Sequence, residues 1–183
     1  MKAITINNPF AWFAVFGVKD VENRSRPTNY RGPLLIHANK EVFNWPDYFW
    51  CPEAFQKEIE RHCELSTPLE KLPAQIAGFM SMIKHAENHL GIDRMDYFDA
   101  ESATMDMQGF EKSLILNSKE RGNPFITNSI IGKVDLVDCV KGHPSSWSAD
   151  SGYQYVLENA EVFAEPIRDV KGWLGIWNFD GEI

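Results

Sequence analysis

Apolar and polar positions at the start of the chain predict a strand followed by a buried helix. The stretch 3–6 is rich in β-branched residues and leads into an Asn-Asn-Pro sequence at 7–9. An Asn can cap a helix whose first turn accepts Pro, so we expect the strand to pass into a helix there. That helix, 9–16, is apolar nearly all round, which is typical of burial on most sides. Gly17 should end it, because Gly adopts the left-handed position without a Cβ clash.

The next polar and apolar positions predict two further strands. Residues 19–24 should leave the helix as a strand with Val21 pointing inward. The run 33–38 is apolar enough to be buried on both faces. His37 would then be a partly buried polar group that needs a hydrogen-bond partner.

The middle of the chain, at about 41–128, changes character and predicts an insertion beside the main fold. Apolar residues recur at helical spacing within 52–65 and again within 79–90, which indicates two amphipathic helices. Residues 93–122 are polar and show no clear periodicity. We therefore expect helices and loops in this insertion.

Strand patterns return after the insertion, most clearly at 130–140. Several short strands with one buried helix near the start predict an α+β fold, a small and partly open β-barrel with helices at its rim. Three more short strands follow, separated by Gly, Pro and Asn, at 153–157, 161–164 and 174–179.

Composition narrows the possible functions. The 183 residues are 44% apolar and 24% charged, which suits one domain of ordinary size carrying an insertion. The net charge of −8 argues against long, sequence-independent binding of nucleic acid, although local capture of a few nucleotides stays open. Three cysteines without a CxxC pattern do not form a disulfide framework. With no signal-peptide pattern and no apolar run long enough for a membrane span, we expect a cytoplasmic protein.

The segment 17–40 reverses the charge of the rest of the chain. It holds five basic side chains against two acidic ones, a local balance of +3. A chain that is acidic everywhere else suits one local site for an anionic ligand. The basic residues are Lys19, Arg24, Arg26, Arg31 and Lys40.

Four blocks of sequence, in order along the chain, form a wider pattern. The first is GxKxxExR at 17–24, preceded by NPFA and followed by YRGPLLIHA. The others are IGKVDLVD at 131–138, VLEN at 156–159 and VKGxxGIW at 170–177. Together the blocks resemble the ASCH domain family, which belongs to the PUA-like superfamily of small β-barrels. One GxKxxExR motif would be a weak signal, but four matching blocks in order are a strong one.

The resemblance implies a barrel with a cleft beside the GxKxxExR segment, used for RNA or modified nucleosides. Some relatives are reported as ribonucleases or amidohydrolases in which the motif lysine, here Lys19, matters. Most members have no established activity. In the amidohydrolase branch the position that matches Glu22 is a Thr, and this departure argues against that specific reaction here.

Lys19 and Glu22 are the candidate catalytic residues if the protein is an enzyme. Lys19 follows a helix C-terminus, where carbonyl dipoles favour a cation, and it could contact a phosphate or act as a base. Alternatively, it is a helix-end charge that pairs with Glu22. Residues three apart in an ideal strand point to opposite faces, so contact between these two requires a turn or a bulge.

Basic and aromatic side chains are the candidate ligand-binding residues. Arginines offer planar donors that suit phosphate or stacking on a base, but they could equally pair with the abundant acids. Aromatic residues of a small barrel usually belong to the core, and we assign Tyr153 and Tyr155 there. Polar neighbours make Trp147 an expected exposed residue, available for base stacking. The ligand-binding candidates are Arg24, Arg26, Tyr30, Arg31, Trp147 and Lys171, the last of which could also be a solvated turn residue.

Two groups of possible metal ligands are weak. His85 and His89 are four residues apart on a predicted helix, but no third ligand is evident and the order differs from that of metalloproteases. We therefore expect no metal and no other cofactor. The second group, which lacks the spacing of a tetrahedral site, is Cys51, His62 and Cys63.

Three functions are open at this point. The first is a module that binds single-stranded RNA or a nucleotide-like small molecule in a basic cleft. The second is a hydrolase that uses Lys19 and Glu22 on an RNA phosphodiester or an N-acyl nucleoside. The third is a scaffold that binds a protein partner through the insertion at 41–128. Binding and catalysis would use the same side chains, so the sequence does not rank the first two.

Overall fold

A computed structural model describes residues 1–42, 52, 54, 57, 61, 71–90, 98–99, 104–105 and 126–183. Its internal contacts divide the chain into two compact units. Met1–Phe43 and Ile126–Ile183 form the first unit, and Asn44–Phe125 form the second. The second unit therefore coincides with most of the segment that the sequence marks as an insertion.

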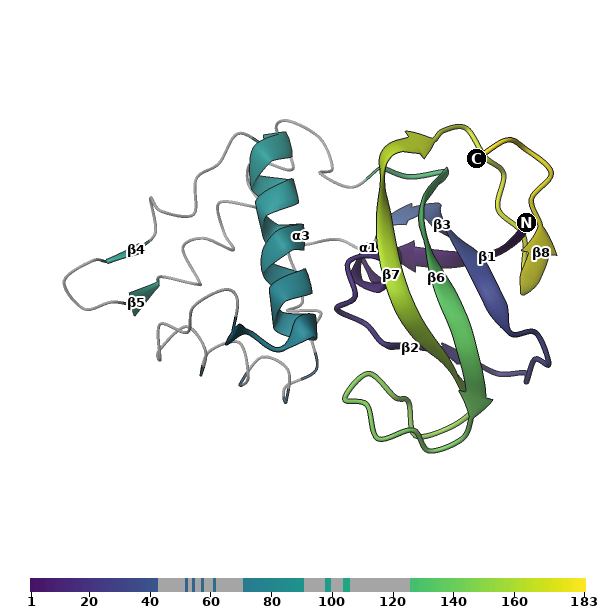
Figure 1. The fold of residues 1–183 in the computed structure, drawn as a ribbon, viewed down its shortest axis with the longest axis horizontal. Coiled ribbons are helices and arrows are strands. Elements are labelled where there is room, and N and C mark those ends of the chain that lie inside the picture. The colour runs from purple at the N-terminus through teal and green to yellow at the C-terminus, as the bar shows by residue number, and fades with distance from the viewer. Residues whose placement is uncertain are drawn as a thin grey trace. The chain divides into compact units, whose positions relative to one another are not determined.

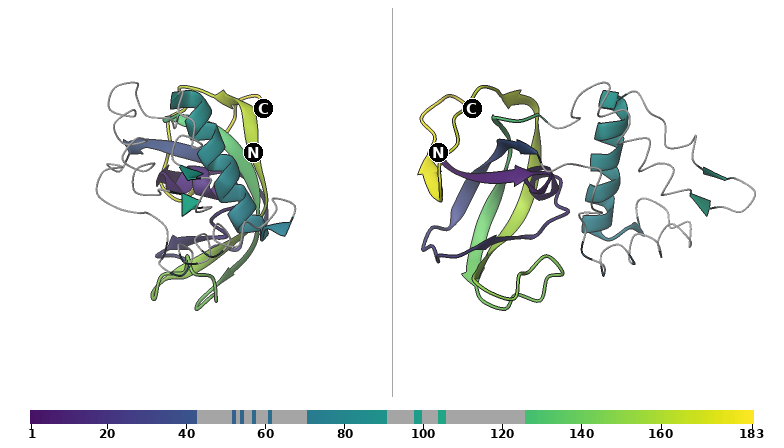
Figure 2. Two further views of the ribbon diagram at one scale, coloured as in Figure 1. Left: turned by 90° about the vertical axis from the view of Figure 1, so that its left-hand side faces the viewer. Right: turned by 180° about the vertical axis from the view of Figure 1, so that it is seen from behind.

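The first unit is built on a six-stranded sheet that curls into a half-barrel (Figures 1 and 2). The strand order is β2-β7-β6-β3-β1-β8, with β1 and β3 parallel and every other pair antiparallel. The predicted α+β class and barrel-like sheet are confirmed. The strands are β1 (Lys2–Asn8), β2 (Val21–Arg24), β3 (Gly32–Val42), β6 (Ser129–Val140), β7 (Tyr153–Ile167) and β8 (Ile176–Asn178).

The predicted first helix is α1 (Phe10–Val15), which packs against β1, β3, β6 and β7. Its residues 11–15 are all buried, as the apolar pattern predicts. Gly17 has a φ of +71°, so the left-handed end of the helix is also confirmed. The expected Asn cap is wrong: Pro9 occupies the cap position, and Asn8 belongs to β1, where its side-chain amide donates to the Asn39 carbonyl at 2.9 Å.

Strand β3 lies in the middle of the sheet and is buried on both faces, as predicted. Residues 34–38 are all buried, including His37, which is 1% exposed. The Nε2 atom of His37 lies 2.8 Å from the Val170 carbonyl oxygen, which can only accept, so Nε2 carries the proton and donates. The polar residue predicted to need a partner thus finds one far away in the sequence.

Strand β7 differs from the prediction of two separate strands. It runs without interruption from Tyr153 to Ile167. Its register against β6 shifts between the pairs of Lys133 with Glu161 and Asp135 with Glu158. Asn159 lies within this shift with a φ of +51°. A β-bulge therefore absorbs the turn signal that suggested a break.

The second unit contains helix α3 (Ala74–Leu90) and a short antiparallel pair, β4 (Phe98–Asp99) and β5 (Thr104–Met105). The amphipathic stretch predicted at 79–90 is helical, and α3 buries Ile76, Phe79 and Met82. The other predicted helix and the polar segment 93–122 lie almost entirely outside the described residues. Among the helices that are described, none has the length and apolar character to cross a membrane.

Candidate functional site

The end of α1 turns Lys19 toward the interior. The backbone N–H groups of Val18 and Lys19 both donate to the Phe13 carbonyl, at 2.8 and 3.0 Å, so the chain wraps around the helix terminus. Because β2 begins only at Val21, Lys19 lies before the part of the chain in which side chains alternate between the two faces of the sheet. Its ammonium group donates to the Val21 carbonyl and, at 2.7 Å, to the Glu22 carboxylate. The turn that a Lys19–Glu22 contact requires is therefore present.

Glu22 joins two cations. One carboxylate oxygen accepts from Lys19, and the other lies 3.0 Å from the Arg24 Nη2 atom. Residues two apart in a strand share a face, which places Glu22 and Arg24 side by side on β2. The side chains of Lys19, Glu22 and Arg24 are 6%, 12% and 26% exposed. We call these three residues the Lys19 cluster; it contains two cations and one carboxylate.

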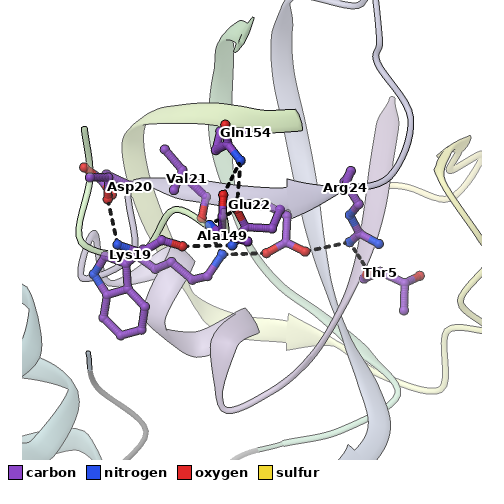
Figure 3. Close-up of polar contacts among 11 residues, drawn as sticks. Thr5, Lys19, Asp20, Val21, Glu22, Arg24, Ala149 and Gln154 are labelled. Atoms are coloured by element: carbon purple, nitrogen blue, oxygen red, sulfur yellow. Dashed lines mark hydrogen bonds and ion pairs between the residues drawn. The ribbon is translucent and has the colours of Figure 1, made fainter. Parts of the chain in front are cut away.

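Arg24 connects the cluster to the opposite edge of the sheet. Its Nη2 atom donates to the Thr5 carbonyl of β1 at 2.7 Å, and Figure 3 shows Lys19, Glu22, Arg24 and Thr5 in one row. Strand β8 covers only residues 2–4 of β1, so Thr5 lies just beyond that pairing. Since β2 is the other edge strand, Arg24 spans the seam, by which we mean the gap between β2 and the uncovered part of β1. The cluster therefore lies where the two edges of the curled sheet approach each other.

A loop at 141–152 is fastened to the strand that holds the cluster. Asn23 donates from its side chain to the Trp147 carbonyl at 2.8 Å and accepts from the Ala149 N–H at 2.9 Å. Asp20 accepts from the Ser145 hydroxyl. These contacts hold the β2 backbone in place. Sequence motifs do not identify Asp20, Asn23 and Thr5 as part of this site, because their partners lie far away in the sequence.

The expected exposure of Trp147 is wrong. The residue is only 6% exposed, and its ring packs edge-on against Phe13 of α1 with 5.4 Å between centroids. The polar neighbours that suggested exposure instead fasten the loop, because Ser145 bonds to Asp20 and the Trp147 carbonyl to Asn23. Trp147 is thus placed as a core residue behind β2.

Tyr30 and Arg31 make their contacts outside the Lys19 cluster. The Arg31 guanidinium pairs with the exposed Asp138 at 2.9 Å. The Tyr30 hydroxyl donates to the Pro33 carbonyl at 2.5 Å, and partial burial followed by the nearby Asp135 charge raises the pKa of Tyr30. Both side chains thus have partners in or near their own loop.

The remaining candidates occupy two further places. The Arg26 side chain is exposed, while its carbonyl accepts from the Tyr155 hydroxyl at 2.9 Å. Tyr155 is buried, which confirms its assignment to the core, and Tyr153 is half-buried. Lys171 is exposed in the loop before β8. The structure therefore joins only Lys19, Glu22 and Arg24 of the predicted site residues directly.

No three His, Cys, Asp or Glu residues in the described part of the chain gather closely enough to hold a metal ion. His85 lies half-buried on α3, and the side chain of His89 lies outside the described residues. The other weak group, Cys51, His62 and Cys63, also lies outside them.

The Lys19 cluster can attract an anion or transfer a proton. It holds one more positive than negative charge in a chain whose net charge is −8. Arg24 uses Nη2 for both of its contacts, and within the described residues its buried Nε–H has no hydrogen-bond partner. A carboxylate in contact with an ammonium group can also take part in general acid–base chemistry.

The sequence matches no protein-family model and no curated protein. The role of the Lys19 cluster is therefore inferred from its geometry.

Proposed function

We propose that this protein is an ASCH-type, PUA-like module that binds single-stranded RNA or a nucleotide-like small molecule at the Lys19 cluster. The observation that carries the proposal is the buried chain of ion pairs with an excess cation at the seam. The GxKxxExR motif supplies all three of its residues. A cytoplasmic location accords with this role.

A gain in folding stability does not by itself explain why ionised groups form this cluster. Withdrawing an ammonium group and a carboxylate from water costs free energy that their attraction only partly returns, so apolar residues of similar volume often serve as well. Lys19 and Glu22 are nearly as buried as the neighbouring core. A ligand that needs a fixed positive charge explains why ionised groups occupy this position.

Arg24 is the residue that suits direct contact with the ligand. Its side chain is the most exposed of the cluster, and Glu22 and Thr5 fix the orientation of its guanidinium through Nη2. Within the described residues its Nε–H has no partner, and the planar arrangement of N–H donors in a guanidinium matches the oxygens of a phosphate. Lys19 and Glu22 would then position Arg24 and add to the local field.

Few phosphates can be bound in this way. The chain is acidic overall, and among the described residues the Lys19 cluster supplies two cations at the seam. Each neutralised phosphate of a single strand contributes about −0.7 to the slope of log K against log salt. We therefore expect a shallow slope of about −1 to −2, far from that of a protein that coats nucleic acid.

Fluorescence anisotropy with a short labelled single-stranded RNA tests the proposal. Lys19→Met and Arg24→Gln should weaken binding by about tenfold or more, because each removes a charge-assisted contact or its support. Lys133→Met is a matched control, since it removes a lysine whose 2.9 Å pair with Glu161 is exposed on β6 and β7. Equal affinity for all four proteins would count against the proposal.

A hydrolase is the second candidate, favoured by the 2.7 Å contact between Lys19 and Glu22. The pair could activate water or a ribose hydroxyl toward an RNA phosphodiester or an N-acyl nucleoside. Product formation from a panel of RNA oligomers and N-acylated nucleosides, abolished by Lys19→Met, would support catalysis. Absence of turnover across the panel would leave binding alone.

A further inference from the structure

The segment 170–175, part of the loop that joins β7 to β8, presents large side chains to solvent. We call it the aromatic loop. Trp173 is 56% exposed and Leu174 is 99% exposed. The Lys171 ammonium lies 4.8 Å from the centroid of the Trp173 ring. An indole with an adjacent cation is thus held at the surface of the first unit.

The backbone of this loop is held firmly. The Val170 N–H donates to the Asn128 carbonyl at 2.9 Å, and the Val170 carbonyl accepts from the buried His37 at 2.8 Å. A Cβ atom on Gly172 would lie 2.5 Å from His37 Cε1 and 2.7 Å from Thr5 Oγ1, so only Gly permits this close approach. Trp173 therefore projects from an anchored segment.

Thr5 joins the aromatic loop to the Lys19 cluster. Its hydroxyl accepts from the Trp173 backbone N–H at 3.2 Å, while its carbonyl accepts from Arg24 at 2.7 Å. Trp177 also donates from its indole to the Thr5 hydroxyl at 3.2 Å, but its ring is half-buried beside His37. Trp173 is the more exposed of the two indoles, and its backbone bonds to the same residue, Thr5, as the Arg24 guanidinium.

We propose that Trp173 is a stacking platform for a nucleobase of the ligand whose phosphate contacts Arg24. This inference rests on the proposed function and adds the class of ligand: an unpaired nucleotide with an accessible base. Stacking on an exposed indole depends little on which nucleobase is present, and the Lys171 ammonium over the Trp173 ring adds positive charge. Bases inside a duplex are already stacked and do not offer a free face.

A lipid surface fits the aromatic loop less well. Interfacial membrane binding draws on an extended apolar face flanked by several basic residues. The aromatic loop presents two strongly exposed apolar side chains and, with the adjacent Arg168, only two exposed basic residues. Its contact with the cluster through Thr5 instead favours a ligand that is flat at one end and anionic at the other.

RNA titrations with Trp173→Ala, Trp173→Phe and Leu174→Ala test the inference. Trp173→Ala should lose about tenfold or more in affinity, because stacking contributes strongly for each base. Trp173→Phe should keep most of the affinity, since it retains a flat ring. Leu174→Ala is the matched control at the neighbouring exposed position and should bind like wild type. Circular dichroism and thermal unfolding should be unchanged in all three.

The salt dependence of RNA binding distinguishes the contribution of stacking from that of charge. Trp173→Ala should leave the slope of log K against log salt unchanged, whereas Arg24→Gln should make it shallower by about 0.7. A blunt-ended RNA duplex should bind more weakly than the single strand to wild type, and Trp173→Ala should reduce that difference.

The outcomes distinguish this inference from the proposed function. If Trp173→Ala binds RNA like wild type while Lys19→Met and Arg24→Gln bind weakly, the stacking platform is overturned and the Lys19 cluster stands. If wild type binds none of the RNA or nucleotide probes, the proposed function itself is overturned. Loss of binding to phosphatidylglycerol vesicles in Trp173→Ala, with RNA binding intact, would also overturn the platform and assign the loop to a lipid surface.

Discussion

Replacing Glu22 by Gln should be the most destabilising single change in the Lys19 cluster. Glu22 is the carboxylate that pairs with both Lys19 and Arg24, whose side chains are 6% and 26% exposed. Removing one partner of a buried ion pair costs about 3–5 kcal/mol, because the other charge is left uncompensated. The exposure of Arg24 lowers its share through solvent screening. We therefore expect Glu22→Gln to lower the free energy of unfolding by about 3 kcal/mol.

Lys19→Met should cost less, although it also breaks the pair. Glu22 keeps Arg24 as a partner, and one buried charge disappears together with its desolvation penalty. The loss that remains is the hydrogen bond to the Val21 carbonyl, about 1–2 kcal/mol. The double variant should cost less than the sum of the two single changes, by about 1–3 kcal/mol.

Urea denaturation followed by circular dichroism measures all four members of this cycle. Equal slopes of the free energy of unfolding against urea concentration would show that the four proteins unfold between comparable states. A Glu22→Gln variant within about 0.5 kcal/mol of wild type, or an additive cycle, would refute the view that Glu22 compensates two cations.

Two further predictions concern the core of the first unit. Burial lowers the pKa of His37, opposed by its bond to Val170, and its buried Nδ1 has no partner in the described part of the chain. Between the lowered pKa of the folded state and about pH 6.5 the unfolded chain therefore binds a proton that the folded chain does not, so the protein loses stability as the pH is lowered through this range, and His37→Gln should flatten this dependence in thermal melts. Gly132→Ala should lower the free energy of unfolding by about 2 kcal/mol or more in denaturant titrations, since its Cβ would lie 2.2 Å from the Glu161 carbonyl oxygen and 2.8 Å from Val15. Unchanged pH dependence or unchanged stability, respectively, would contradict these expectations.

Local patterns predict those elements whose burial is decided by neighbours in the sequence. The apolar run of α1 and the doubly buried run 34–38 of β3 are both recognisable, because few environments other than a core accept them. Gly17 marks the helix end for a steric reason that operates within the chain segment itself. These features need no knowledge of strand order.

Long-range pairing decides the features that the sequence did not reveal. Strand β7 continues past Asn159 because β6 accommodates a bulge there. Trp147 is buried because Phe13 and Asn23 lie beside its loop in the folded chain. Arg24 meets Thr5 only because the sheet curls until its edges approach each other. Each outcome depends on contacts between segments that are far apart in sequence.

The most direct measurement follows the Arg24 Nε–H group by ¹⁵N NMR during titration with a mononucleotide. This group is buried, so its proton should exchange with water slowly enough to be observed. We expect a saturable shift of its signal with uridine monophosphate, a much smaller one with uridine, and a weaker response in Lys19→Met, with the signal assigned by its loss in Arg24→Gln. A signal that stays in place up to high nucleotide concentration would contradict an anion site at the Lys19 cluster.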